Sequence, residues 1–592
     1  MTQLKLERLR EILTQKHLSA IIIPTSDTHK SEYIPTYWKT REWLTGFSGS
    51  AGTSVVTKKH AGLWTDSRYF VQAEKQLQAP FELHKLKTRQ PEYIDWIIEN
   101  LNLWDTVGIN AQLFSAAEIE LFKTKLETKH IKINDVGDVF EKIWFDRPPL
   151  PENKITVHDD KFTELNRLQK IEKIRSYLKA GSCEQLLISA LDDVAWLLNL
   201  RGNDVEFNPI FRTFLLLSLT EVFLFVDENK ISADLLASLR NDGLKILPYS
   251  EIELYLSSNK KVSNIEVDKN TVNYRLIQSI PTSCEIIYKN SITTQYKAIK
   301  SLAEINRYRE SQVRDGLAMC SFLHWLENAC KTESISEIDA AEKATSFRRA
   351  QENYMGLSFE VISAYEANAA LPHYSPNANN PVFLKPKGLY LIDSGAQYLD
   401  GTTDITRTIA LGEVTSEQIN DYTLVLKGHI RLADAKFPHG TKGFHLDTLA
   451  RLDLWQQGKD FGHGTGHGIG YFLNVHEGPQ GFSQSDFSPG NTIIEPGMLI
   501  TNEPGIYIEG KYGIRTENVM ACVTDTTIES GTFLMFETLT YCPYDKNLID
   551  VTLLSETEKN WINNYHKKVF ELISPKASND VFKWLKTKTL PI

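Results

Sequence analysis

Residues 385–407 read KPKGLYLIDSGAQYLDGTTDITR, and residues 495–518 read EPGMLITNEPGIYIEGKYGIRTEN. The second stretch looks like a diverged copy of the first, because a shift of 110 positions places Asp393 on Glu503 together with neighbouring proline, leucine and glycine positions. Each copy has an apolar run, an acidic residue, a glycine turn and a second acidic residue. Apolar runs bounded by glycine turns are typical of strands joined in hairpins. The pattern predicts two related hairpins.

The two hairpins would bring four carboxylates to one site: Asp393, Asp404, Glu503 and Glu517. Anions gathered in a dry place repel one another, so they must be protonated, paired or bound to a metal. An oxygen-rich set without thiolates suits hard or borderline divalent ions. The sequence therefore predicts a metal centre between the hairpins.

The second hairpin places its two acids opposite each other if its loop centres on Gly510, because Glu503 and Glu517 are equally distant from that glycine. The first hairpin is harder to arrange. A two-residue turn at Asp400-Gly401 would leave its two acids about 13 Å apart along the strands, too far to share ions. We therefore expect a wider loop or a bulge across residues 397–402.

A glycine-rich segment, GHGTGHGIG at residues 462–470, lies between the hairpins. Five glycines in nine residues exclude a stable helix and let the backbone approach a ligand closely. The segment matches neither the phosphate-binding GxxxxGK nor the dinucleotide-binding GxGxxG pattern. Its useful groups are the imidazoles of His463 and His467, with His476 following in NVHEGP.

Five motifs in one order carry a resemblance to a known family: LIDSGAQYLDGTTDITRT, HGTGHGIG, NVHEGP, NEPGIY and IRTEN. Together they resemble the Xaa-Pro aminopeptidases (aminopeptidase P) of the pita-bread metallopeptidases. The match looks closest to the long, three-domain cytosolic type. It covers nearly the whole chain, including WTDSRYF at residues 64–70 and WINNYH at residues 561–566.

The resemblance implies ligands for two divalent ions, with manganese expected first and zinc or cobalt as alternatives: Asp393, Asp404, His467, Glu503 and Glu517. Two such ions hold a bridging hydroxide that attacks a scissile carbonyl. Glu503 would serve as ligand and base. His373, in LPHYSP, and His476 resemble the family's proton-handling and transition-state-stabilising histidines, although His373 alone would also suit a turn.

Further residues are expected to bind substrate, each with a structural alternative. His463 would contact substrate or support His467. Arg515 lies two residues before Glu517, so it would share that strand face and orient the Glu517 carboxylate. Arg68, in WTDSRYF, resembles a peptide-contacting arginine, with a surface arginine as the alternative. His373 and His476 complete the expected substrate-binding set.

One departure from the family pattern precedes His373. Glu366 and Ala367 stand where a small or glycine-containing turn is expected. An additional charge at this position would alter the rim of the pocket.

The composition limits the class of protein. A chain of 592 residues is too long for one core and predicts two to four domains. A net charge of −10 disfavours nucleic acid as the main partner. The six cysteines are scattered without a CxxC pair, which is typical of reduced thiols. No signal peptide is apparent, and the apolar stretch 214–226 is too short to span a bilayer. We expect a cytoplasmic protein without membrane contact.

The fold class expected is α/β (α+β): two related creatinase-like α/β domains at residues 1–150 and 151–300, then a pita-bread catalytic domain with a C-terminal extension at 301–592. The proline-rich segment 147–154 is the first clear linker. The second section repeats the first in outline. Capping boxes at Ser301 and Ser555 predict the starts of helices.

The sequence is interpreted as a metallo-aminopeptidase that removes the first residue from short peptides with proline second. As the resemblance implies, the N-terminal domains would narrow access and contribute to a homodimer. A prolidase is one alternative, disfavoured by the duplicated first 300 residues, and a methionine aminopeptidase is another. A pita-bread module that has lost its metals and only binds proteins or histones is the alternative from a different class.

Overall fold

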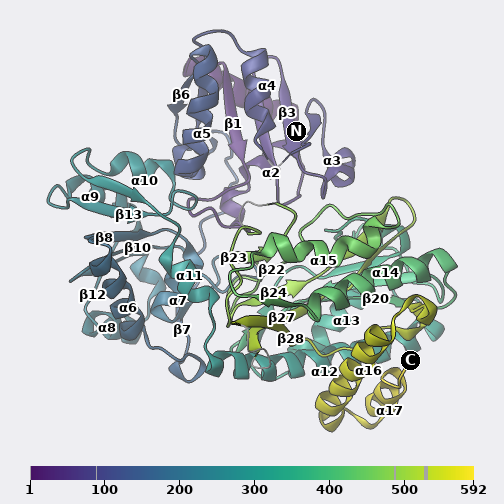
Figure 1. Cartoon of the computed structure of the whole chain (residues 1–592). Helices are drawn as coiled ribbons and strands as arrows, with labels where there is room; N and C mark the ends of the chain where they lie inside the picture. Colours follow the sequence, from purple (N-terminus) through teal and green to yellow (C-terminus); the bar gives the residue numbers. More distant parts are fainter. Residues whose placement is uncertain (1, 89, 486–488, 526–530) are drawn as a thin grey trace. The chain divides into compact units, whose positions relative to one another are not determined.

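The computed structural model describes residues 2–88, 90–485, 489–525 and 531–592 (Figure 1). The chain forms two compact units. Unit 1 comprises residues 1–159 and 165–293, and unit 2 comprises residues 160–164 and 294–592. Each unit is described by itself.

Unit 1 contains two six-stranded sheets of the same topology. In each sheet one central strand pairs antiparallel with a hairpin strand on one side and parallel with a strand on the other. The first sheet runs β4 (Glu82–Lys85), β3 (Ala61–Thr65), β2 (Thr53–Thr57), β1 (Ala20–Pro24), β5 (Thr106–Ile109), β6 (Lys132–Asp135). The second runs β12 (Leu244–Leu247), β11 (Val222–Phe225), β10 (Phe214–Ser218), β8 (Gln185–Ile188), β13 (Asn264–Val267), β14 (Glu285–Tyr288). The predicted duplication is confirmed.

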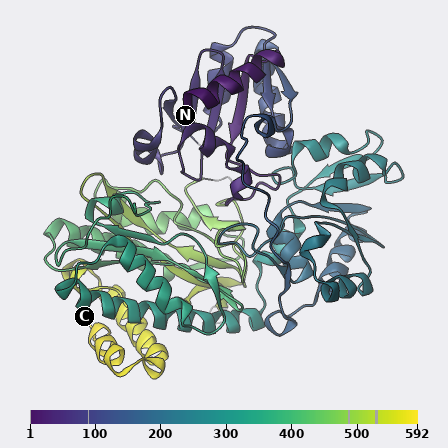
Figure 2. The ribbon, with the colours of Figure 1, turned by 180° about the vertical axis from the view of Figure 1, so that it is seen from behind.

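Helices cover both faces of the first sheet. Helix α1 (Thr2–Gln15) packs on the face seen in Figure 2 through a buried stripe of Leu6, Leu9, Ile12 and Leu13. Helices α4 (Glu92–Asn100) and α5 (Ala116–Leu126) cover the other face. Alternate residues of β1 enter the two cores, as the period of a strand requires. Short helices α2 (Thr40–Thr45) and α3 (Phe70–Gln76) flank the sheet.

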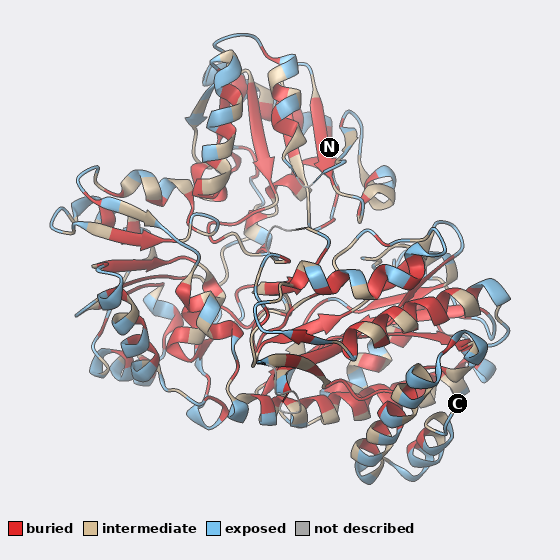
Figure 3. Cartoon of the chain, in the orientation of Figure 1, coloured by how far each residue is buried: buried red, intermediate tan, exposed pale blue. Residues whose placement is uncertain are grey.

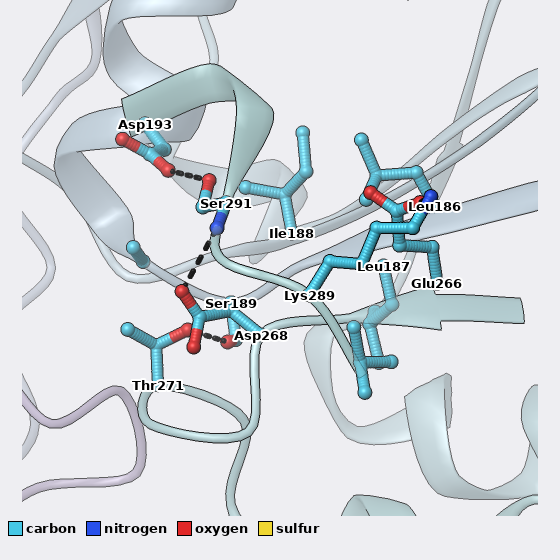
Figure 4. Close-up of a pocket in the computed structure, with 12 residues that line it drawn as sticks. Leu186, Leu187, Ile188, Ser189, Asp193, Glu266, Asp268, Thr271, Lys289 and Ser291 are labelled. Atoms are coloured by element: carbon cyan, nitrogen blue, oxygen red, sulfur yellow. Dashed lines mark hydrogen bonds and ion pairs between the residues drawn. The ribbon is translucent and has the colours of Figure 1, made fainter. Parts of the chain in front are cut away.

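The second sheet is flanked by five helices: α6 (Arg167–Ala180), α7 (Leu191–Leu198), α8 (Ala233–Asn241), α9 (Ile252–Ser258) and α10 (Tyr274–Ser279). A polar network fixes the chain that leaves this sheet (Figure 4). The fully buried carboxylate of Asp193, on α7, accepts a hydrogen bond of 2.6 Å from the Ser291 hydroxyl. The Ser291 backbone donates to Asp268, which follows β13. Ser291 thus connects α7 with the segment that follows β13.

Unit 2 is built on long helices. Helix α12 (Leu302–Thr332) begins at the capping box of Ser301 and Glu304, and α16 (Glu556–Ile573) begins at that of Ser555 and Glu558, so both predictions are confirmed. The other helices are α11 (Ile292–Ala298), which spans the boundary between the units, α13 (Glu337–Arg349), α14 (Ser416–Ala433), α15 (Gly443–Trp455) and α17 (Asn579–Lys588). Figure 3 shows the strands of this unit as its most buried layer.

Four sheets of unit 2 support the predicted hairpins. One three-stranded sheet runs β16 (Ile362–Tyr365), β17 (Leu389–Ser394), β20 (Ile405–Ala410). Another runs β15 (Tyr354–Leu357), β18 (Ala396–Tyr398), β19 (Gly401–Thr402). A two-stranded sheet is β25 (Gly505–Ile508) and β26 (Tyr512–Arg515). The six-stranded sheet runs β21 (Lys436–Pro438), β28 (Phe533–Thr538), β27 (Asn518–Asp525), β24 (Leu499–Asn502), β22 (Gly466–Gly468), β23 (Glu477–Phe482).

The prediction of a wide loop or a bulge in the first hairpin is wrong. Tyr398 pairs with Gly401, so the turn is a tight one at residues 399–400, one position earlier than assumed. The same register continues into the paired strands β17 and β20, where Asp393 pairs with Thr406. Moving the turn by one residue shifts every cross-strand pair by two. Asp404 therefore lies only two positions along the strand from Asp393's partner, about 7 Å, and no bulge is needed.

The second hairpin has the register that its central glycine predicts. Gly505 pairs with Arg515 and Asn502 with Asn518, on either side of the two acids. Gly510 has a φ of +72°, a conformation that suits glycine in the turn. Glu503 and Glu517 are thus opposed as predicted.

All six cysteines are buried free thiols, in line with their scattered spacing. Over the described ranges, none of the helices has the length and apolar character needed to cross a membrane.

Candidate metal centre

The carboxylates of the two hairpins converge in unit 2 with the imidazole of His467, which comes from the glycine-rich segment between them. The His467 Nε2 atom lies 3.5 Å from Asp404 Oδ2 and 3.6 Å from Glu503 Oε1. One ligand atom from each of Asp404, His467 and Glu517 lies within 4.8 Å of the other two. Asp404 is 4% exposed and Glu517 is 1% exposed. Spacing of this kind is what ligands around a small cation require.

Strand ends hold the acids in place. Asp393 is the penultimate residue of β17 and Asp404 directly precedes β20, while Glu517 lies between β26 and β27. The two hairpins are joined at Thr406, whose backbone carbonyl accepts from the Glu517 N–H and whose hydroxyl donates to Glu517 Oε2 at 2.7 Å. The duplicated segments therefore meet directly at the acids.

Three buried carboxylate oxygens find no N–H or O–H donor among the described residues: Asp393 Oδ1, Asp404 Oδ1 and Glu517 Oε1. A buried anionic oxygen without a partner is strongly unfavourable, so cations are the groups that fit here. Oxygen ligands with one imidazole accept manganese, zinc or cobalt. The donor set therefore fits two divalent ions.

Electrostatics give the same answer. Burial, followed by the charge of the neighbouring Asp393, raises the pKa of Asp404 well above its usual value. Burial and nearby carboxylates also raise the pKa of Glu517. Burial raises the pKa of Glu503 to about 7, against the opposing influence of His467 and Arg515. Without cations the cluster must retain protons, because adjacent buried anions repel.

Glycines deliver His467 to this cluster. A side chain at Gly466 would lie 1.9 Å from the Thr501 carbonyl, and one at Gly468 would lie 2.1 Å from the Glu477 carbonyl. Only glycine lets these strands approach so closely. The His467 Nδ1 atom is 2.9 Å from the Gly468 carbonyl, which leaves Nε2 toward the acids. Close packing of neighbouring strands therefore explains why the motif has glycine at positions 466 and 468.

Arg515 reaches Glu517 only through the Thr406 hydroxyl, and its direct carboxylate partner is Asp393. Its Nη2 donates to Asp393 Oδ2 at 2.5 Å, its Nε donates to the Thr406 hydroxyl and its Nη1 donates to the Tyr507 hydroxyl at 2.8 Å. Asp393 belongs to another sheet, so pairing within one strand could not reveal this partner. Arg515 is only 3% exposed, and its hydrogen bond fixes the position of the Asp393 carboxylate.

His463 lies beside Glu503 and contacts Tyr507. Its Nε2 lies 2.7 Å from the Tyr507 hydroxyl, and its Nδ1 lies 3.9 Å from Glu503 Oε2. Tyr507 thus links His463 to Arg515. Tyr507 and Thr406 were not among the predicted site residues, although both lie inside the quoted motifs. Each is an even number of strand positions from an acid, so the alternation of side chains along a strand could have placed them on the same face as that acid.

The other two candidate histidines are in unit 2. The ring of His476 stands perpendicular to that of His467, with centroids 4.2 Å apart. His373 is exposed, on the turn after the short helix η8 (Glu366–Ala370), which packs against β26. The Glu366 carboxylate accepts from the Leu389 backbone N–H at 2.5 Å, so its charge is engaged by the backbone at the start of β17.

Arg68 lies in unit 1, between β3 and α3. Its guanidinium makes two hydrogen bonds to Asp66, of 2.8 and 2.7 Å, and about a third of its side chain is exposed. This pairing fixes the direction of the arginine within its own unit.

Family models cover almost all of the chain. The model for metallopeptidase family M24 matches residues 306–524, and the model for its C-terminal region matches residues 532–592. Two models of the creatinase/prolidase N-terminal domain match residues 5–143 and 146–304. The chain is thus an M24 metallopeptidase with two creatinase-type domains before its catalytic domain.

Relatives of full length narrow the class. The chain is 40% identical to Xaa-Pro aminopeptidase 1 of Dictyostelium discoideum, over 99% of this chain and 96% of the relative. It is 37% identical to aminopeptidase P2 of Arabidopsis thaliana, over 99% and 88%. The chain therefore belongs to the Xaa-Pro aminopeptidase family within M24.

Solved structures give the same placement. An X-prolyl aminopeptidase from Caenorhabditis elegans, described as a cytosolic enzyme with a di-nuclear active site, superposes with a TM-score of 0.95 at 35% identity, and all of both chains is covered. A Xaa-Pro dipeptidase from Bacillus anthracis gives a TM-score of 0.51 at 26% identity and covers 64% of this chain and 99% of its own. The dipeptidase has no counterpart for the remaining part of this chain.

Proposed function

We propose that this protein is a dinuclear-metal aminopeptidase that hydrolyses the bond between the first residue and a proline in second position. The observation that carries the proposal is the set of buried carboxylate oxygens without donors, facing His467 on two duplicated hairpins. The full-length similarity to Xaa-Pro aminopeptidases supports the choice of substrate.

The residues proposed to hold the two ions are Asp393, Asp404, His467, Glu503 and Glu517. When bound, the ions would lower the pKa of a shared water and polarise the scissile carbonyl. Manganese is the proposed metal, with zinc and cobalt as alternatives, because these ligands accept all three.

Proton transfer is assigned to Glu503 and the nearby histidines. Glu503 is proposed to take the proton from the shared water and to pass it on, the general acid–base role that the family resemblance implies for this ligand. His476 stands beside His467 and is proposed to stabilise the transition state, with His373 handling protons at the leaving nitrogen. His463 and Tyr507 are proposed to fix the Glu503 side of the site and contact substrate.

Arg515 is proposed to act chiefly by positioning Asp393, since its donors are engaged by Asp393, Tyr507 and Thr406. Arg68 is proposed as a peptide contact by family resemblance. The domain division at about residues 150 and 300, a homodimer and a cytoplasmic location are also proposals. The family-model boundaries support the domain division, and the description of the C. elegans relative as cytosolic supports the location. The homodimer rests on the family resemblance alone.

Three peptides test the specificity. Proline in second position makes the scissile bond a tertiary amide without an N–H and fixes φ, so a pocket can select its shape. Release of the first amino acid is measured at equal concentration from Arg-Pro-Pro, Arg-Ala-Pro and Arg-Pro. We expect rapid cleavage of the first peptide only. Preferential cleavage of Arg-Pro would indicate a prolidase, and equal cleavage of Arg-Ala-Pro would indicate a general aminopeptidase.

A further inference from the structure

A second group of potential metal ligands lies in unit 1, at the β3–β4 edge of the first sheet. One ligand atom from each of His60, Glu82 and His84 lies within 4.8 Å of the other two. The His60 Nδ1 atom is 3.6 Å from Glu82 Oε1. Apart from the centre already described, this is the other such group found among the described residues.

The sequence places these side chains on one face. Strands β3 and β4 are parallel, with Gly62 paired to Glu82 and Trp64 paired to His84. Side chains two residues apart share a face of a strand, so Glu82 and His84 project beside Gly62 and Trp64. His60, two residues before Gly62, has the same parity in the turn that enters β3. His60, in HAGLW at residues 60–64, therefore lies on the same face of the sheet as Glu82 and His84, in ELH at residues 82–84.

Gly62 makes room for the first imidazole. A β-carbon at this position would lie 2.7 Å from His60 Nε2 and 2.5 Å from the Trp64 ring. The glycine has an ordinary φ, so its role is to leave space and not to adopt a special backbone conformation. Because that space is free, the His60 ring can turn back over β3 toward Glu82.

Tryptophans hold both imidazole rings. The His84 ring stacks on Trp64 with centroids 4.0 Å apart and planes inclined by 8°. The His60 ring packs on Trp96, from α4, with centroids 4.5 Å apart. Such contacts fix the ring directions before any ion arrives. Ligands that are already oriented bind a metal with less loss of conformational entropy.

Polar atoms in this cluster lack partners. The Nε2 atoms of His60 and His84 are buried and have no hydrogen-bond partner among the described residues. A buried ring nitrogen is ordinarily paired, so His84 Nε2 is a candidate for a bound ligand. The His60 atom near Glu82 is Nδ1, so His60 would bind a shared metal through that nitrogen. Burial lowers the pKa of both imidazoles, which favours the neutral form that binds metals.

We propose that His60, Glu82 and His84 form a third metal position, separate from the catalytic pair, for zinc or another borderline divalent ion. Two imidazoles and one carboxylate are a known zinc-binding set that leaves a fourth position for water or another ligand. Tetrahedral zinc requires ligand atoms roughly 3.4 Å apart. Closing from the present spacing needs a small movement of Glu82, whose side chain is 69% exposed.

The site is separate from the peptidase chemistry, so its test does not depend on the proposed function. The full-length protein is dialysed against zinc, and bound metal per chain is measured by mass spectrometry for wild type, His84→Phe and Glu82→Ala. His84→Phe keeps an aromatic ring on Trp64 and removes the nitrogen. We expect one metal ion fewer per chain in His84→Phe. Because losing an outer partner of a metal ligand costs about 10–100-fold in affinity, losing His84 itself should weaken zinc binding at this site at least 100-fold.

His130→Phe is the matched control. His130 stacks on Trp104 at 4.4 Å and lies 3.3 Å from Glu127, but this arrangement supplies one imidazole only. The His130→Phe variant should bind as much zinc as wild type. Equal zinc content in wild type, His84→Phe and Glu82→Ala would overturn the proposal. If His84→Phe fails to fold, Glu82→Ala decides alone, because Glu82 is exposed and its removal disturbs no core packing. Peptidase activity should be unchanged in all three variants.

Discussion

Arg515 donates a hydrogen bond of 2.5 Å to Asp393, a residue on another sheet and 122 positions earlier in the chain. The arginine also binds Tyr507 and Thr406, so one buried guanidinium connects an acid of the first hairpin with residues of both. This contact fixes the spacing of the two hairpins at the candidate metal centre.

Arg515→Lys should weaken metal binding by about 10–100-fold, because a lysine cannot reproduce the planar fork that holds Asp393, Tyr507 and Thr406 together. Metal affinity is measured by titrating the metal-free protein. Arg309→Lys is the control, since Arg309 pairs with Glu537 in the same unit but is partly exposed. Equal affinities in wild type and Arg515→Lys would show that Asp393 needs no support.

Asp404→Asn should abolish activity and raise the stability of the metal-free protein. The substitution removes one carboxyl group from a buried cluster, so the metal-free protein has one fewer buried acid that must be either charged or protonated. Thermal unfolding of wild type and variant is compared after removal of metal with a chelator, and activity is measured after adding manganese. A variant that is less stable without metal, or that retains normal turnover, would contradict the assignment.

The metal-free protein should lose stability as pH rises from 6 to 8. The folded-state pKa of Glu503 is raised to about 7, above the unfolded value, so its contribution is present below the unfolded pKa and is lost as pH rises through 7. Asp404 and Glu517 shift in the same direction. Unfolding temperature measured against pH checks this. Manganese should reverse the trend, because binding displaces protons.

The two adjacent histidines should separate binding from catalysis. His467→Ala should lose metal, because its Nε2 faces Asp404 and Glu503. His476→Ala should retain metal and lower kcat by about 10²–10⁴-fold. Metal content and kcat are measured on the same preparations. Loss of metal in His476→Ala with full retention in His467→Ala would reverse the two roles.

The second hairpin could be predicted closely from the sequence, because a single glycine at its centre sets the register and places Glu503 opposite Glu517. The first hairpin could not. Asp400-Gly401 is the usual signal of a two-residue turn, yet the turn lies at residues 399–400, and the later choice displaces Asp404 by two pairing positions. The partner of Arg515 was equally hidden, because it depends on how separate sheets pack and not on alternation along one strand.

Anomalous diffraction from a crystal of the protein soaked in manganese tests the central claim most directly. The account predicts two peaks about 3.5–4 Å apart, within ligand distance of Asp393, Asp404, His467, Glu503 and Glu517. A single peak, or peaks elsewhere with these five side chains unbound, would contradict a dinuclear centre on the two duplicated hairpins.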